Sequence, residues 1–223
     1  MKFRQTMTLI GFGLIPAVSM AQLSGNVGYM SDYIYRGLYQ EESAAMAGLD
    51  YEHDSGFYIG AWAADVDIGF ETDLYFGYGG EAGDFSYSIG YTGYFYTDDF
   101  DTEYNEINLG VGWMGLSLDV AAGSWDGVVG DPLTEDDYTI LELGYEYEGV
   151  YVTFGSADYD KAPSTLDWVE IGYGFEWEGL DLSIAIVNTS DGIVDELGFA
   201  AGQPLAADNA LLFSISRSFS IGE

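Results

Sequence analysis

The sequence has no cysteine among its 223 residues, and only 5 lysines and arginines stand against 38 aspartates and glutamates. Without cysteine the chain has no disulfide, no thiolate metal site and no cysteine nucleophile. The shortage of cations excludes a nucleic-acid binder, because nothing would neutralise the phosphates. Long apolar runs are also missing, since after the N-terminus no segment approaches the roughly 18 apolar residues that a membrane-spanning helix needs.

Aromatic residues and glycine are abundant instead. The chain contains 31 glycines, 19 tyrosines and 13 phenylalanines, and 48% of its residues are hydrophobic. This apolar content argues against a disordered chain, and the length suits one domain.

The first 21 residues have the pattern of a secretory signal peptide. Lys2 and Arg4 precede an apolar stretch at residues 7–18, and the segment Ser19–Ala21 ends on small residues, as cleavage sites do. Cleavage would leave Gln22 as the first residue, and the mature chain would carry three cations against 38 acids, a net charge of −35. An uncleaved anchor helix is the alternative, which the shortness of the apolar stretch disfavours.

We therefore expect a signal peptide at residues 1–21, export through the Sec pathway, and one mature domain at residues 22–223. An exported chain with no spanning helix is either a soluble protein or a membrane β-barrel.

A period of two dominates the mature chain and predicts β-strands. In residues 104–113, Ile107, Leu109, Val111 and Trp113 alternate with Glu106, Asn108, Gly110 and Gly112. Residues 116–122 and 169–177 alternate in the same way. Because successive side chains of a strand point to opposite faces, each segment has one apolar face and one polar or glycine-rich face.

Tight turns and longer loops alternate between these segments. Short turns are expected at residues 54–56, 81–84, 114–115, 148–149 and 178–179, and longer polar loops at 37–43, 65–69, 97–102, 126–137, 158–166 and 190–208. This spacing predicts about twelve strands and an all-β, antiparallel, up-and-down transmembrane barrel with short turns on the periplasmic side. The expected strands are 25–36, 44–52, 57–64, 70–79, 85–96, 104–113, 116–125, 138–147, 150–158, 167–177, 180–189 and 210–219.

The cost of placing a carboxylate in hydrocarbon decides which face meets lipid. The aliphatic and aromatic parity is expected to face lipid, and the acidic and glycine-rich parity a wet interior. A soluble β-sandwich or soluble barrel also alternates and is the rival interpretation. The long strands and the glycine-rich polar face favour the membrane.

One motif carries a family resemblance. Ser31-Asp32-Tyr33-Ile34-Tyr35-Arg36-Gly37, followed by Gln40, resembles the TorF family of small porin-like outer-membrane proteins. Weaker matches follow at residues 55–62, 73–78, 91–96 and 105–110. The resemblance implies a small bacterial outer-membrane porin.

Six residues are candidates for lining a pore: Asp32, Arg36, Glu106, Asp119, Glu142 and Glu170. Arg36 is one of only three cations in the mature chain. It lies too far along a strand from Asp32 to pair with it, since four strand residues span about 13 Å. We expect it to meet acids of neighbouring strands inside the barrel, either as a pore constriction or as a structural ion pair.

The acidic composition predicts a passive, cation-leaning channel for small polar or cationic solutes, with outer-membrane lipid as its surroundings. The alternative is a closed barrel that conducts nothing and acts as a structural or surface-binding protein through its acidic loops. Inward glycines and serines, such as Gly28, Gly48 and Gly90, favour open space, whereas inward tyrosines could fill it.

No enzymatic activity, cofactor or built metal site is expected. The acidic loops at residues 98–103, 131–137 and 158–160 lack the spacing of an EF-hand, so at most they would bind divalent cations weakly. The only histidine, His53, lies beside Ser55 on a turn, where adjacent residues rarely reach the geometry of a catalytic triad.

Overall fold

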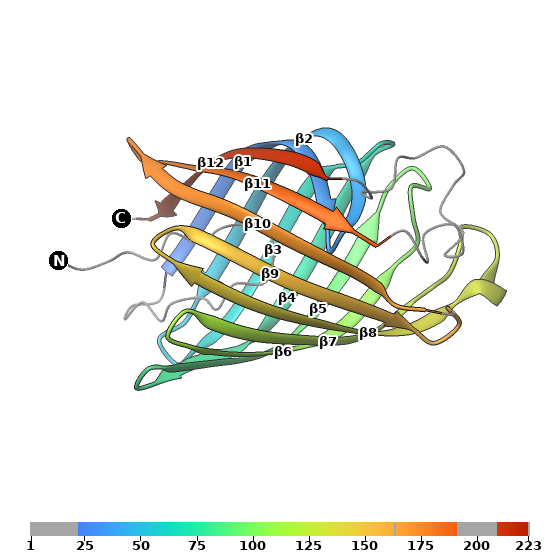
Figure 1. Cartoon of the computed structure of the whole chain (residues 1–223), viewed down its shortest axis with the longest axis horizontal. Helices are drawn as coiled ribbons and strands as arrows, with labels where there is room; N and C mark the ends of the chain where they lie inside the picture. The colour runs from blue at the N-terminus through green and yellow to red at the C-terminus, as the bar shows by residue number, and fades with distance from the viewer. Residues whose placement is uncertain (1–21, 163, 191–208, 223) are drawn as a thin grey trace.

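The computed structural model describes residues 22–162, 164–190 and 209–222, and within them twelve antiparallel strands close into one barrel (Figure 1). Each strand pairs with its neighbours in the chain, and β12 pairs with β1 to close the ring. The strands are β1 (Gln22–Tyr35), β2 (Leu38–Glu52), β3 (Phe57–Asp65), β4 (Phe70–Ala82), β5 (Phe85–Tyr96), β6 (Tyr104–Trp113), β7 (Leu116–Trp125), β8 (Asp136–Tyr147), β9 (Val150–Tyr159), β10 (Leu166–Trp177), β11 (Leu180–Thr189) and β12 (Ala210–Ile221), with a short 3₁₀ helix η1 (Pro132–Thr134) before β8.

The predicted barrel and its strand number are therefore confirmed. The predicted signal peptide at residues 1–21 lies outside the described residues, as does most of the predicted loop at 190–208. In the described ranges no helix is long and apolar enough to cross a membrane.

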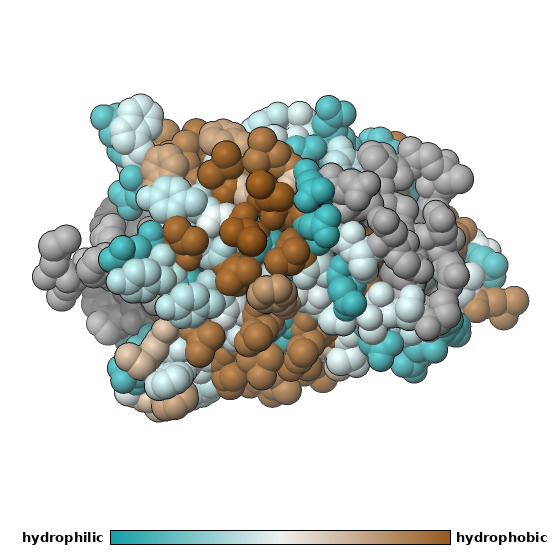
Figure 2. Space-filling model, in the orientation of Figure 1, coloured by the Kyte–Doolittle hydropathy of each residue, from teal (hydrophilic) through white to brown (hydrophobic). Residues whose placement is uncertain are grey.

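The two faces of the strands separate as the alternation predicts. On β6, Ile107, Leu109 and Val111 are half exposed on the outside, whereas Glu106 on the opposite parity is buried at 1% exposure. On the face seen in Figure 2, hydrophobic residues form a band across the middle of the barrel, with hydrophilic residues toward both ends. An apolar outer band with a polar inner face is the arrangement that lipid requires.

Several short turns close with two residues in the left-handed conformation. In the turn after β8, Glu148 and Gly149 have φ angles of 52° and 84°, and the turn after β10 repeats this with Glu178 and Gly179 at 51° and 78°. Two positive φ values in a two-residue loop give the turn whose twist matches the flanking strands. The turns on this side, the turn end of the barrel, therefore hold adjacent strands in register.

The predicted loop at residues 37–43 is wrong. A two-residue turn, Arg36-Gly37, joins β1 directly to β2, which begins at Leu38. Both turn residues have positive φ, 50° and 78°, so the strands continue as a tight hairpin where a polar loop was expected.

This hairpin leaves the barrel wall. Within the described residues, the register of β1 with β12 stops at Met30, and the register of β2 with β3 starts at Met46. Residues 31–43, called the inner hairpin below, pair only with each other in the ladder, with a register shift between Tyr33 and Ile34. The ends of β1 and β2 curl away from the neighbouring strands (Figure 1, blue).

Side chains replace the ladder where the hairpin departs. The Phe213 N–H on β12 donates to Ser31 Oγ at 2.9 Å, and the Ala45 N–H donates to Asp65 Oδ2 at 3.2 Å. These bonds satisfy backbone donors that would otherwise lose their partners. The wall strands on both sides of the hairpin, β12 and β3, are therefore joined to β1 and β2 by side-chain hydrogen bonds at the point where the hairpin leaves them.

Candidate functional site

The tip of the inner hairpin lies inside the barrel, against the far wall. Arg36 lies in the turn, and its Nη1 and Nη2 donate to the two carboxylate oxygens of Glu106 on β6 at 2.9 and 3.1 Å. Its Nε lies 3.7 Å from Glu142 Oε2 on β8. Such a two-pronged contact fixes the direction of the guanidinium as well as its charge. The hairpin is therefore anchored across the lumen.

The prediction that Arg36 meets acids inside the barrel is confirmed, but the prediction that these acids lie on neighbouring strands is wrong. The arginine does meet acids inside the barrel, but they lie on β6 and β8, which are not neighbours of β1 or β2 in the strand order. It reaches them because it occupies a turn that folds inward, whereas the sequence placed it at the end of a strand in the wall.

Glu106 is the centre of the anchor. Besides Arg36, its carboxylate accepts hydrogen bonds from Tyr94 at 2.7 Å, from Tyr138 at 3.0 Å and from Asn108 at 2.7 Å. The side chain of Glu106 is fully buried, and that of Arg36 is 11% exposed. A buried carboxylate is tolerated when a cation and hydrogen-bond donors surround it, as here.

Two other predicted pore residues, Asp119 and Glu170, lie near this anchor. Asp119 on β7 stands directly opposite Glu142 on β8 in the strand register, so two like charges face each other. Glu170 on β10 accepts a hydrogen bond from Tyr151 at 2.5 Å. Like charges placed opposite each other in a sheet are destabilising unless a cation or water shares the site. Arg36 lies beside Glu142 and supplies the nearest such cation.

Asp32 does not join this group. It lies on the inner hairpin, opposite Glu42 in the register, and is partly exposed. Its carboxylate accepts a hydrogen bond from the adjacent Ser31 hydroxyl at 3.0 Å. The structure therefore brings Arg36, Glu106 and Glu142 into contact, places Asp119 and Glu170 close by, and leaves Asp32 apart.

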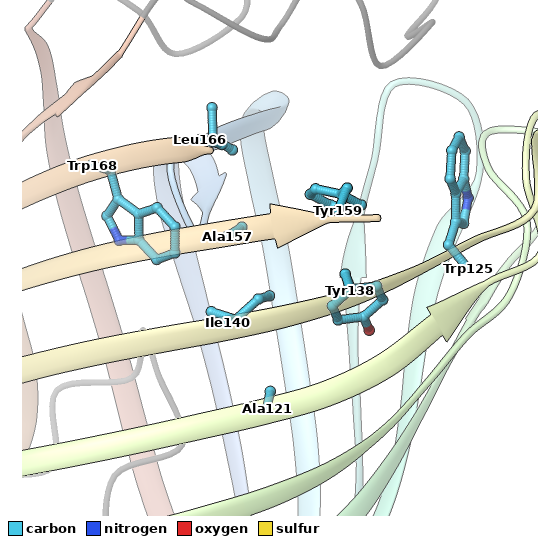
Figure 3. Close-up of a cluster of buried hydrophobic side chains, with 8 residues drawn as sticks. All are labelled: Ala121, Trp125, Tyr138, Ile140, Ala157, Tyr159, Leu166 and Trp168. Carbon is cyan, nitrogen blue, oxygen red and sulfur yellow. The ribbon is translucent and has the colours of Figure 1, made fainter. Parts of the chain in front are cut away.

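An apolar inner wall receives the hairpin. Figure 3 shows its buried side chains on β7, β8, β9 and β10, and Leu38 of the inner hairpin packs against them. A second buried group joins Ile34 at the tip to Val187 and Leu212 on β11 and β12. The larger cluster comprises Ala121, Trp125, Tyr138, Ile140, Ala157, Tyr159, Leu166 and Trp168. At this level the lumen contains a packed core.

The tip is also held by its backbone. Thr189 Oγ1 at the end of β11 donates to the Gly37 carbonyl at 2.8 Å. A methyl group on Gly37 would come within 2.9 Å of both Thr189 and Trp168, and the φ of 78° already disfavours any side chain there. Glycine is thus required both for the turn and for the close approach to the wall.

Inward glycines do not leave the space that the sequence suggested. A methyl group added to Gly90 would meet the Tyr58 hydroxyl, and one on Gly155 would overlap the Trp168 ring. Gly172 is covered in the same way by Tyr151 on the neighbouring strand. The aromatic ring of a residue on another strand lies against each of these glycines and occupies the space that a side chain would take. Glycine content is therefore no measure of an open lumen.

Sequence reasoning missed the apolar inner wall and the acids of β4, Glu71 and Asp73. A signal for the wall existed, because Ile140-Leu141 and Trp168-Val169 are apolar on both parities near the end of the barrel opposite the turn end, called the loop end below. A wall with lipid on one side and water on the other needs apolar residues only on the lipid side. Apolar residues on both sides at these two places therefore indicate an insert packed inside the barrel.

Asp101 in the first acidic loop is partly buried. Asp101 accepts hydrogen bonds from Tyr104 at 2.8 Å and from the Trp125 indole at 3.1 Å, and burial raises the pKa of its carboxyl. Among the described residues no group of three or more acidic or histidine side chains is placed to hold a metal ion. The expected weak divalent sites on the loops therefore have no built counterpart there.

Solved structures with a similar fold include porins. The KdgM porin superposes with a TM-score of 0.55 at 9% sequence identity, over 89% of this chain and 99% of that chain. The KdgM porin in complex with disordered oligogalacturonate gives 0.53, again at 9% identity and with the same coverage. A membrane protein from a study of in-meso crystallization gives 0.58 at 10% identity, over 90% and 84% of the two chains. At such identities the likeness establishes the fold.

No curated protein shows significant sequence similarity to this chain. The family model described as "Bacterial protein of unknown function (Gcw_chp)" matches residues 16–219, and the chain belongs to this bacterial family.

Proposed function

We propose that this protein is a passive diffusion channel of the bacterial outer membrane for small polar and cationic solutes, narrowed by its inner hairpin. In this proposal residues 1–21 direct export as a signal peptide, and the barrel belongs with the TorF porins that its Asp32–Gly37 motif resembles. The fold supports the proposal, because the closed barrel of this chain is similar in fold to the KdgM porin over nearly the whole length of that porin.

The observation that carries the proposed selectivity is the charge of the lumen. Asp119, Glu142 and Glu170 line it together with the single cation Arg36, which is already bound to Glu106. Carboxylates at the narrow part of a pore concentrate cations and repel anions, and the low-dielectric wall strengthens their field. Solutes of positive charge are therefore favoured.

The similar porin offers a contrast in charge. KdgM has been described in complex with oligogalacturonate, which is a polyanion. The acidic lumen of the present chain would repel such a ligand, because its carboxylates outnumber the one arginine. We therefore propose a different solute class for the two barrels.

A closed barrel is the second candidate, and one observation favours it. The hairpin tip is buried against four strands, with Leu166 and Trp168 only 1% and 5% exposed. A lumen sealed at this level would conduct nothing, and the protein would act through its acidic loops.

The test is conductance of the purified mature protein in a planar bilayer under a gradient of potassium chloride. We expect discrete channels with a reversal potential that favours potassium. The variants Asp119→Asn and Glu142→Gln should each shift this potential toward zero, whereas Asp99→Asn, on an exposed loop, serves as the matched control and should not. A reversal potential that favours chloride would contradict the proposed selectivity, and complete absence of conductance would favour the closed barrel.

A further inference from the structure

Two acids on β4 form a second charged group beside the Arg36 anchor, since Asp73 stands next to Tyr94, which donates to Glu106. Glu71 and Asp73 are two residues apart on the strand and therefore share its inner face. Their carboxyl groups lie close enough to interact with each other. In the sheet Glu71 stands between Ala64 and Tyr96, and Asp73 between Trp62 and Tyr94. The pair thus lies behind the inner hairpin, near the loop end of the barrel.

Both acids are deeply buried, and each has an unsatisfied oxygen. Glu71 is 1% exposed and Asp73 is 7% exposed. Tyr33 of the hairpin donates to Glu71 Oε1 at 2.9 Å. Among the described residues, Glu71 Oε2 and Asp73 Oδ1 have no hydrogen-bond partner, and the nearby Trp62 Nε1 has no acceptor. Unpaired buried carboxylate oxygens are costly and indicate a missing partner.

Among the described residues no cation forms an ion pair with this pair, although Arg36 is near enough to Asp73 to act on it electrostatically. The mature sequence holds only three, and Arg36 is bound to Glu106 and Glu142. Lys161 lies in the loop before β10, where its Nζ donates to the Leu133 carbonyl. Arg217 on β12 is exposed. Because the Arg36 guanidinium is already bonded to Glu106 and Glu142, a partner bonded directly to the two carboxylates has to come from solution.

We propose that Glu71 and Asp73 bind a partly hydrated divalent cation of the magnesium type. Magnesium is commonly held by one or two carboxylates while it keeps several of its own waters. A metal-bound water has an oxygen that accepts from Trp62 Nε1, so the same ligand satisfies the two orphan oxygens and the orphan donor. The bound ion also stabilises the hairpin, because Tyr33 is bonded to one of its ligands.

Two simpler occupants would satisfy fewer of these demands. A water molecule could bridge the three orphan atoms but would leave two negative charges side by side. A proton shared by the carboxyl groups would remove one charge and leave the indole donor unsatisfied. The experiment below separates these occupants from a metal ion.

The mature protein, refolded in detergent micelles, is titrated with terbium, and its luminescence is read on excitation of the tyrosines and tryptophans. We expect saturable sensitised emission that magnesium displaces, and a midpoint of thermal unfolding that rises with magnesium and falls with a chelator. The variants Glu71→Gln and Asp73→Asn should each weaken the displaceable component about tenfold or more, because each removes one of the two charged ligands. Asp50→Asn is the matched control: Asp50 is another inward acid, bonded to Tyr75, and its substitution should leave terbium binding unchanged.

Three outcomes overturn the proposal. Emission that is equal in wild type and both β4 variants would place the ion on the acidic loops. No magnesium effect on wild-type unfolding would leave only water in the site. A pH-dependent stabilisation that neither chelator nor magnesium alters would indicate the shared proton. The wild-type titrations need no variant, so the proposal stays testable if a substitution prevents folding. Conductance does not enter the test, and failure here leaves the proposed channel untouched.

Discussion

The two ends of the lumen are built differently. At the loop end, the inner face of β7 to β10 is apolar and packs against the inner hairpin, with Trp168 and Leu166 buried. At the turn end, inward positions hold small and polar residues, such as Ser86, Ser88 and Ser117, which remain partly exposed. The loop end therefore resembles the core of a soluble protein, and the turn end resembles the lining of a channel.

The inner face of the barrel thus packs against the hairpin at one end and meets water at the other. An apolar inner wall has a reason to exist only where another part of the chain covers it, because bare apolar surface facing water is unfavourable. A polar inner wall needs only water. The boundary between them falls at the layer of Arg36, Glu106 and Glu142, where charged groups meet the end of the hairpin.

Removing the inner hairpin should have the largest effect on this comparison. Met30 and Ala44 stand opposite each other in the register, so an Asn-Gly turn can replace residues 31–43 between them. We expect single-channel conductance to rise severalfold, because the packed end would become as open as the turn end. The measurement is made in planar bilayers against wild type. An unchanged conductance in a folded variant would show that the hairpin does not limit the pore.

The substitution Glu106→Gln should have the second largest effect, a loss in the free energy of unfolding. It leaves the Arg36 guanidinium buried without its main partner, and breaking a buried pair from one side costs about 3–5 kcal/mol. The free energy of unfolding is measured by urea titration in micelles. In the double variant Arg36→Met with Glu106→Gln most of this loss should return, since no unpaired charge remains. A double variant as unstable as the single one would contradict the assigned role of the charge.

Leu166→Ala tests the packed wall directly. Its side chain is 1% exposed inside the barrel, and deletion of a buried leucine costs about 2–5 kcal/mol through the cavity it leaves. Leu143→Ala on the outer face of β8 is the control, because lipid or detergent tails can fill the gap it creates. Equal losses in urea unfolding would mean that the inner wall is not packed as described.

Asp101→Asn should remove a small pH dependence of stability. Burial raises the pKa of this loop carboxyl, so the folded state binds its proton more tightly than the unfolded state does. Its contribution is therefore most favourable at acidic pH and is lost as the pH rises through the folded-state pKa. The difference in unfolding free energy between wild type and variant, measured across pH, should show this trend. A flat difference would refute it.

The smallest effect is expected at the turn end. Glu148 has a φ of 52°, a conformation that asparagine adopts more readily than glutamate. Glu148→Asn should stabilise the barrel by about 0.5 kcal/mol or less. The same change at Glu178, with φ of 51°, should behave alike, and urea unfolding of both variants checks it. A loss of stability at either position would contradict the turn geometry.

Most of the wall followed from the sequence. The period-two pattern gave the correct inner and outer faces on β6, β7 and β10, and the short turns at 114–115, 148–149 and 178–179 lie where they were predicted. These features are local, since the alternation of a strand and the conformation of a two-residue turn depend on residues next to each other. The fold shared with the KdgM porin agrees with the predicted barrel.

The candidate site followed only in part. The inward parity of Glu106, Glu142 and Glu170 was predicted, and so was an acid partner for Arg36. The position of this partner across the barrel was not predicted, because the prediction placed residues 37–43 in an outer loop. Glu71 and Asp73 were overlooked, since nothing local distinguishes them from other acids of the chain.

The sequence by itself determined a barrel, its strand number and the faces of its strands, because each strand carries that information in its own alternation. Only the tertiary structure decided what occupies the interior. Whether a hairpin continues the wall or turns inward depends on contacts between residues far apart in the chain, such as Gly37 with Thr189 and Arg36 with Glu106. Such contacts exist only once the barrel has closed around the hairpin.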